Sequence, residues 1–367
     1  MKVVIEQSDL LDGLKTVSRA VSGQNTLPVL GNILIKAEGK KLHFSATNLE
    51  ISIATSVEAN IKNEGSITIP AKILTSYTSL LKKDEDIELK LADGLALEVN
   101  SKTSKTKIKG ISADEFPDIT RVDSGVKLSL STEDFRSMVQ EVAFSAQENA
   151  SRPILSGVLL KVDKKGLSIA ATDSYRLSEK KIKLEKETQE MSAVVPVRAI
   201  FEADRLAAGG KKIDIMVSEN QVSFAVNGTE LVSRLIEGQF PDYHQILPKS
   251  HKTTAIVDRD DLSLAVRRVS IFAKENNQHM KLEFLNDETL TVSTGSTEIG
   301  EERTTVPIKL EGATNIIALN ADYVLDVLGA MSGEEKITIE LEGKLNPAVF
   351  KKEKGKDFVH LIMPLKL

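Results

Sequence analysis

The chain has 367 residues, of which 41% are hydrophobic and 28% charged. These shares are typical of globular proteins, so the length predicts two or three folded domains and excludes a largely disordered chain. No cysteine is present, which excludes disulfides, thiolate nucleophiles and Cys-ligated zinc or iron–sulfur sites. The 48 basic and 53 acidic residues give a net charge of −5, which excludes a surface that is basic everywhere but leaves room for a local basic one.

The N-terminal segment and the hydropathy pattern bear on location. Glu6 lies close to the start of the chain, so an acidic side chain interrupts the segment before the apolar region of a signal peptide could form. No apolar run approaches the roughly 18 residues that a membrane-spanning helix needs. We therefore expect a soluble protein of the cytoplasm that does not contact a membrane.

A long internal repeat organises the sequence, and such repeats decide the fold. Phe116-Pro117-Asp118 recurs about 124 residues later as Phe240-Pro241-Asp242, and Met363-Pro364 follows at nearly the same interval. Turn-rich polar stretches lie at residues 123–125 and 248–250, where we expect linkers. Three domains are therefore predicted, at residues 1–122, 127–248 and 252–367.

Two helices are predicted in each repeat. The first helices follow polar caps and carry apolar residues spaced three and four apart; the caps are Ser8, Ser131 or Thr132, and Asp258. The second helices are predicted at residues 71–83, 197–212 and 320–331. Pro70 and Pro196 stand at the starts of two of them, where the missing N–H of proline costs nothing.

Most of the remaining chain alternates between apolar and polar residues, as half-buried strands do. Examples are Ile87–Val99 and Ser218–Val226, and Asn227-Gly228 is typical of a tight turn between two strands. The pattern predicts an α+β protein whose antiparallel sheets are covered by helices on one face.

Motifs for catalysis or for metal and phosphate binding are not found in the sequence. The five histidines show no metal-ligand spacing, and the usual phosphate-binding loops and the nucleophile elbow do not occur. Asp173, Tyr175 and Arg176 form a polar cluster, for which a β-turn with solvated charges is the favoured interpretation. A hydrolase that uses Asp173 and Arg176 is the enzyme alternative.

Basic residues gather in a few segments. In residues 101–109, lysines alternate with other residues around Ile108. An edge strand explains this pattern, because lysine protects an unpaired edge from aggregation. The helices at 71–83, 197–212 and 258–274 carry Lys and Arg, whereas those at 131–147 and 320–331 are net acidic. This uneven distribution of charge among the helices gives only partial support for contact with nucleic acid. Stacking of bases on the protein is disfavoured because no aromatic residues interleave with the basic ones.

Several motifs occur in order along the whole chain. They are TLPVLGN at Thr26–Asn32, ATDSYRL at Ala171–Leu177, FPDY at Phe240–Tyr243, NADYVLDVL at Asn320–Leu328 and IMPLKL at Ile362–Leu367. Together with the threefold repeat, they resemble the bacterial sliding clamp, the β subunit of DNA polymerase III.

The resemblance implies three clamp-type domains per chain, with antiparallel sheets outside and two helices per domain inside. Two chains would close head to tail into a homodimeric ring around double-stranded DNA. At about 10 Å per helix, the helices of two chains would enclose an opening of ~28 Å. A duplex about 20 Å wide, with grooves roughly 8 Å deep, passes through it with room for a layer of water. The protein would be a non-catalytic processivity factor of the replicative polymerase, without a cofactor.

The resemblance also implies residues that face DNA without reading its sequence. They are Gln24, Lys72, Asn149, Arg152 and Arg198. Gln24 occupies a place that is often basic in relatives, and a tether between helix and strand is an equal alternative for Arg152.

A second implied site is a pocket that holds short peptide segments carrying a Gln and hydrophobic anchors. Its partners would be the replicative polymerase, the clamp loader, repair polymerases and mismatch-repair proteins. The matching positions are Leu155, Thr172, Ser174, Tyr175, Arg176, Leu177, Pro241, Gln245, Ile246, Asn320, Tyr323, Met363, Pro364, Leu365 and Lys366. Tyr175 replaces a smaller ring and Gln245 a cation that some relatives carry.

The seam of the ring would join the last strands of domain 1 to domain 3 of the partner. The resemblance places Ile108 near Ile271 and Phe272. It also places three lysines opposite three glutamates; these are Lys102, Lys105 and Lys107, and Glu298, Glu301 and Glu302. The competing interpretation of the whole chain is a repeat-built peptide or glycan adaptor that needs neither a ring nor DNA.

Overall fold

The computed structural model describes residues 1–21, 27–147, 152–184, 188–296 and 298–366. Strands and helices follow one another in the same order in all three repeats, apart from one additional short strand in the first. All strand pairs formed by the described residues are antiparallel. The predicted α+β class and the threefold repeat are therefore confirmed.

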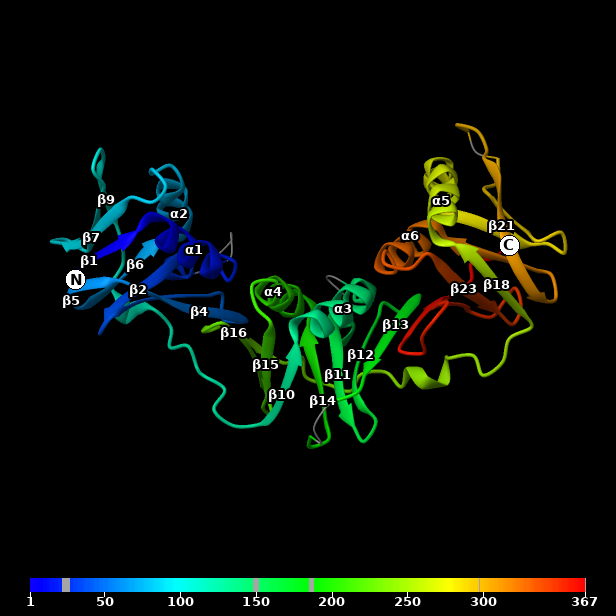
Figure 1. Cartoon of the computed structure of the whole chain (residues 1–367), viewed down its shortest axis with the longest axis horizontal. Helices are drawn as coiled ribbons and strands as arrows, with labels where there is room; N and C mark the ends of the chain where they lie inside the picture. Colours follow the sequence, from blue (N-terminus) through cyan, green and yellow to red (C-terminus); the bar gives the residue numbers. More distant parts are fainter. Residues whose placement is uncertain (22–26, 148–151, 185–187, 297, 367) are drawn as a thin grey trace. The chain divides into compact units, whose positions relative to one another are not determined.

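The elements of the three repeats are as follows (Figure 1). The first repeat contains β1 (Lys2–Glu6), α1 (Gln7–Ser18), β2 (Asn32–Glu38), β3 (Lys41–Thr47), β4 (Ile51–Glu58), β5 (Asn60–Asn63), β6 (Gly65–Pro70), α2 (Ala71–Ser79), β7 (Asp86–Ala92), β8 (Ala96–Asn100) and β9 (Lys105–Lys109). The second contains β10 (Val126–Ser131), α3 (Thr132–Val142), β11 (Gly157–Asp163), β12 (Gly166–Thr172), β13 (Arg176–Ile182), β14 (Met191–Pro196), α4 (Val197–Ala207), β15 (Lys212–Val217), β16 (Gln221–Val226) and β17 (Thr229–Arg234). The third contains β18 (Thr253–Asp258), α5 (Arg259–Ala273), β19 (His279–Phe284), β20 (Thr289–Ser293), β21 (Arg303–Gly312), β22 (Asn315–Asn320), α6 (Ala321–Ala330), β23 (Lys336–Leu341), β24 (Ala348–Lys352) and β25 (Phe358–Ile362).

Strand pairing joins each repeat to the next. β4 of the first repeat pairs with β17 of the second, and β13 of the second pairs with β25 of the third. The second repeat is thereby shared between two compact units, residues 1–135 with 201–235 and residues 136–200 with 236–367. The first unit holds a five-stranded and an eight-stranded sheet, and the second holds a sheet of twelve strands. The boundaries at 1–122, 127–248 and 252–367 remain a prediction.

The helices bury one apolar stripe each against the strands, as their spacing predicts. In the third repeat, Leu262, Val266 and Val269 of α5 and Val324 and Leu328 of α6 are fully buried in one core with the sheet residues. Asp258 caps α5, because its carboxylate accepts the backbone N–H groups of the first turn.

Three local predictions need correction. Ser8 does not cap α1, because the helix already begins at Gln7 and the Ser8 hydroxyl donates to the carboxylate of Glu6. Residues 87–99 form a hairpin of β7 and β8 instead of one strand, because the backbone turns at Asp93-Gly94, where Gly94 has a φ of +76°. Pro364 is not the counterpart of Pro117 and Pro241. In each repeat a residue just after the last strand donates its amide to the strand before the second helix; these residues are Ile111, Ile236 and Leu365. Pro117 and Pro241 follow that residue, whereas Pro364 precedes it.

Candidate functional site

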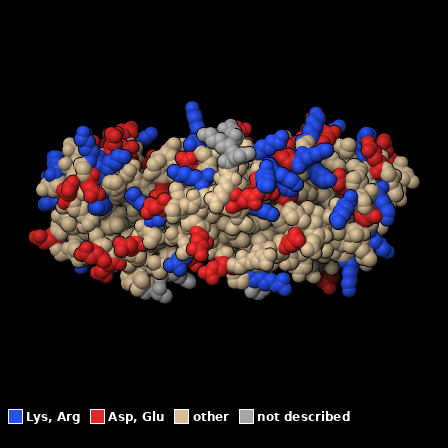
Figure 2. Space-filling view, turned by 90° about the horizontal axis from the view of Figure 1, so that it is seen from below, with Lys and Arg blue, Asp and Glu red and all other residues tan. Residues whose placement is uncertain are grey.

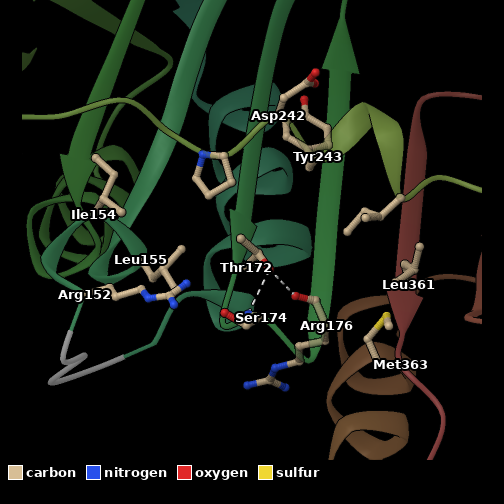
Figure 3. A pocket seen from close by; sticks show the side chains of 12 residues that line it. Arg152, Ile154, Leu155, Thr172, Ser174, Arg176, Asp242, Tyr243, Leu361 and Met363 are labelled. Atoms are coloured by element: carbon tan, nitrogen blue, oxygen red, sulfur yellow. Dashed lines mark hydrogen bonds between the residues drawn. The ribbon is translucent and has the colours of Figure 1, made fainter.

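A cavity of about 280 Å³ opens in the second unit. Figure 3 shows Ile154 and Leu155 on one side, Leu361 and Met363 on the other, and Asp242 with Tyr243 at one end. Seven residues of the predicted peptide site line the cavity: Leu155, Thr172, Ser174, Arg176, Pro241, Ile246 and Met363. The size and the apolar walls suit a few side chains of a peptide.

The turn between β12 and β13 forms one wall, and side-chain hydrogen bonds fix it. The hydroxyl of Thr172 donates to the Arg176 carbonyl over 2.7 Å and accepts the Ser174 amide over 3.1 Å. One carboxylate oxygen of Asp173 accepts the amides of Tyr175 and Arg176, each over 2.9 Å. Ser174 has a φ of +80°, and the bonds around it hold this uncommon conformation in place.

The same turn recurs in the first repeat between β3 and β4. Thr47 donates to the Ile51 carbonyl over 3.1 Å and accepts the Leu49 amide over 3.0 Å. Asn48 takes the place of Asp173 and accepts the amides of Glu50 and Ile51. The first unit therefore contains a natural copy of this turn.

Asp173 and Arg176 are not solvated, so that part of the sequence interpretation is wrong. Their side chains are 10% and 11% exposed, and Arg176 Nε donates to Asp173 over 3.0 Å. The guanidinium of Arg176 lies 5.4 Å from the ring centre of Phe144 and 4.5 Å from that of Tyr323. It also donates to the Phe144 carbonyl over 2.9 Å and forms an ion pair with Asp326. The two rings and the two carboxylates exclude water from the cation.

The floor of the cavity is apolar and continuous with the core. Leu177 is fully buried beneath it and packs in one cluster with Phe240, Tyr243 and Leu361. Burial raises the pKa of Tyr243 far above its ordinary value, and the hydrogen bond to Glu179 and the charge of Glu179 add to this shift. Tyr243 therefore stays neutral and serves the structure of the floor.

The remaining predicted peptide residues are not among those that line the cavity. Tyr175 is 63% exposed, and Gln245 donates to Asp242 over 2.8 Å. Asn320 caps α6, and Tyr323 of the same helix stacks on Arg176. The last three are Pro364, Leu365 and Lys366; Leu365 donates its amide to the Ala318 carbonyl over 2.8 Å, and the Lys366 carbonyl lies 2.7 Å from Nε2 of His279.

Sequence reasoning missed some lining residues. They are Ile154, Asp242, Tyr243 and Leu361, together with Arg152, which was assigned to DNA. Asp242 and Tyr243 belong to the FPDY motif, so the motif itself was a sufficient signal for them. Leu361 could not be read from the sequence, because its position beside the cavity depends on the pairing of β25 with β13.

Comparison with known proteins bears on this arrangement of repeats and pocket. Family models of the DNA polymerase III beta subunit match the N-terminal domain at residues 1–120, the central domain at 129–242 and the C-terminal domain at 244–366. The chain belongs to the DNA polymerase III beta subunit family. The prediction of a sliding clamp subunit that is not itself catalytic is thereby confirmed.

Relatives of the clamp match over their full length. The curated beta sliding clamp of Synechococcus elongatus is 32% identical over all of both chains, and that of Bacillus subtilis is 27% identical. The crystal structure of the Pseudomonas aeruginosa sliding clamp matches with a TM-score of 0.94 at 26% identity, covering 100% of both chains. The Bacillus subtilis clamp structure matches with a TM-score of 0.95 at 26% identity, covering 100% of this chain and 99% of that one.

Two of the residues predicted to face DNA in this clamp are exposed on helices, Lys72 on α2 and Arg198 on α4. Arg152 lines the cavity described above. Gln24 and Asn149 lie outside the described residues. Figure 2 shows Lys and Arg interspersed with Asp and Glu on the face in view.

The residues of the predicted seam lie at two places. Lys105, Lys107 and Ile108 belong to β9, and Lys102 precedes this strand. Ile108 is 8% exposed, so the chain itself already buries it. Ile271 and Phe272 end α5, and Ile271 is 60% exposed. The segment between β20 and β21 carries Glu298, Glu301 and Glu302.

Within the described ranges, no group of three or more His, Asp or Glu side chains could hold a metal ion. None of the helices in those ranges is both long and apolar enough to cross a membrane.

Proposed function

We propose that two copies of this clamp close head to tail into a ring around double-stranded DNA and tether other proteins through the cavity. The pairing of the repeats carries the proposal. Consecutive repeats join through the fourth strand of one and the last strand of the next, as β4–β17 and β13–β25. The corresponding strands left over are β21 and β9, so joining them between two copies would repeat the same connection twice and close the ring.

Both leftover strands offer a free edge. Within the described residues, β9 pairs only with β8, and residues 303–307 of β21 pair only with β20. A shallow hollow lies beside that part of β21 and is lined by Leu264, Ala265 and Arg268 of α5. An unpaired edge next to an exposed apolar side chain such as Ile271 is a surface that a partner strand can cover.

Charge complementarity supports the same seam. Lys102, Lys105 and Lys107 near one edge would face Glu298, Glu301 and Glu302 near the other. Opposite charges at the rim fix the register of an interface and make it sensitive to salt. The apolar centre would come from Ile271 and Phe272 more than from the already buried Ile108.

Inside the ring, Lys72 and Arg198 would contact phosphates, with Gln24, Asn149 and Arg152 as further DNA-facing residues. Such contacts carry no sequence information and are individually weak, so they allow sliding. Topology, and not adhesion, would then keep the clamp on its DNA.

The cavity would bind the short segments of the replicative polymerase, the clamp loader, repair polymerases and mismatch-repair proteins. Its apolar floor suits Leu and Phe side chains, and the flexible thioether of Met363 can adapt to several peptides. We also retain as proposals the cytoplasmic location and the three domain boundaries.

Sedimentation at micromolar concentration tests the ring directly. We expect a species of twice the 40.1 kDa of the chain, and we expect salt to shift it toward the single chain. A single chain that binds peptides at low salt without dimerising would instead indicate an adaptor that does not need DNA.

A further inference from the structure

Asp326 on α6 contacts the Arg176 guanidinium at the edge of the cavity. It belongs to the NADYVLDVL motif, but it is not among the residues predicted for the peptide site. Its side chain is 47% exposed, whereas that of Arg176 is 11% exposed. The contact joins the third repeat to the β12–β13 turn of the second. A half-exposed carboxylate is therefore held against a buried cation that lines the cavity.

The surroundings of Arg176 leave its guanidinium little freedom. Nε donates to Asp173, Nη1 to Asp326 and Nη2 to the Phe144 carbonyl. The faces of the group lie against Phe144 and Tyr323. A planar cation held by three acceptors and two rings presents a fixed surface, since each contact removes an alternative orientation.

The charges around the cavity do not balance. Arg152, Arg176 and Asp242 line it, and Asp173 and Asp326 contact Arg176 from outside. Three carboxylates thus accompany two cations. Asp173 also accepts two backbone amides of the β12–β13 turn. The hydrogen bond that the structure gives for the Asp326 carboxylate is the one from Arg176.

We propose that Asp326 is a positioning residue that holds Arg176 and offsets its charge, and thereby lowers the affinity of the cavity for acidic peptides relative to neutral ones. The inference rests on the proposed peptide-binding function. Because the cavity is only about 280 Å³, an acidic residue of a bound peptide lies within the roughly 10 Å over which charges act at 0.1 M salt.

Two blocked peptides provide the test, Gln-Leu-Ala-Leu-Phe and Gln-Leu-Asp-Leu-Phe, each acetylated and amidated. Fluorescence anisotropy with the full chain at 0.1 M salt gives the ratio of their dissociation constants. Asp326→Asn should shift this ratio toward the acidic peptide by about 3- to 10-fold. Asp326→Glu, which restores the charge, should return it toward the wild-type value.

Asp322→Asn is the matched control, since Asp322 is exposed on the same helix one turn earlier. It makes the same charge change on the same helix face, but Arg176 pairs with Asp326 and not with Asp322. Because an exposed charge without this contact acts weakly, the ratio should stay within about 2-fold of the wild-type value. A ratio that is unchanged in Asp326→Asn, or that shifts equally in Asp322→Asn, overturns the proposal. If neither peptide binds the wild-type chain, peptide binding itself fails, and the inference falls with it.

Discussion

The hydroxyl of Ser178 lies 2.7 Å from Nδ1 of His360, although the two residues are 182 positions apart. Both are fully buried in the paired strands β13 and β25. Ser178 also lies 2.8 Å from the hydroxyl of Ser145, and the ring of Phe144 stacks on the imidazole. This polar chain crosses the junction of two repeats directly behind the cavity residue Arg176.

His360 makes the stability of this junction depend on pH. Burial, with a smaller effect of the Arg176 charge, lowers the pKa of His360 from 6.5 to about 3. Below about pH 6.5 the unfolded chain therefore binds a proton that the folded chain does not bind until the pH nears 3. The free energy of unfolding should fall by about 1.4 kcal/mol per pH unit through that window on account of this residue.

Urea unfolding at several pH values between 4 and 6 measures this effect in the wild type and in His360→Phe. The variant should lose the His360 part of the slope, while other groups titrate alike in both chains. Equal slopes would contradict the assignment. An NMR titration of the wild-type imidazole provides a second test that does not depend on the variant folding.

Met363 is expected to contribute to peptide affinity. The residue is 37% exposed and lines the cavity, and its amide donates to the Tyr175 carbonyl over 2.8 Å. Met363→Ala removes the side chain and keeps the backbone bond, so peptide binding should weaken by about 1–3 kcal/mol in calorimetry. Leu345→Ala, at an exposed site that does not line the cavity, should leave the affinity unchanged; no loss for Met363→Ala would reject the pocket.

The repeated turn allows stability to be separated from binding. Thr172→Val and Thr47→Val remove the same hydroxyl, which bonds to the Arg176 carbonyl in one turn and to the Ile51 carbonyl in the other. Each should lower the free energy of unfolding by about 1–2 kcal/mol. Only Thr172→Val should also weaken peptide binding, and equal effects of both variants on affinity would show that the turn does not shape the site.

The exposed end of α5 is expected to hold the two copies together. Ile271→Asp places a charge in the apolar centre of the proposed seam, while the isolated chain tolerates it because the position is 60% exposed. Sedimentation should show at least about a 30-fold weaker dimer, as expected for about 2 kcal/mol at an interface centre. Leu345→Asp places the same charge at another exposed apolar residue of the third repeat and should leave the dimer intact.

Sequence alone could predict the features that depend on local pattern. The caps Ser131 and Asp258, the helix stripes and the Asn227-Gly228 turn are of this kind, whereas the predicted cap Ser8 lies inside α1. Most residues that line the cavity follow from motifs in order along the chain. The burial of Arg176 could not be foreseen from local pattern. Phe144 contacts it from 32 residues away in the same repeat, and Asp326 contacts it from the third repeat, which the pairing of β13 with β25 joins to the second. The equivalence of Pro364 with Pro117 and Pro241 fails for a related reason. Prolines at equal intervals along the chain need not occupy the same place in the strand pairing of each repeat.

Encirclement of DNA is the central claim, and retention on DNA with and without ends tests it most directly. Chains separated by salt are allowed to reassemble in the presence of nicked circular DNA, and the bound protein is isolated by gel filtration before and after one restriction cut. We expect protein to stay with the circle at moderate salt and to leave once the DNA is linear, because a ring slides off an open end. Equal retention on circular and linear DNA would show that the protein holds its DNA by adhesion, and would contradict the account.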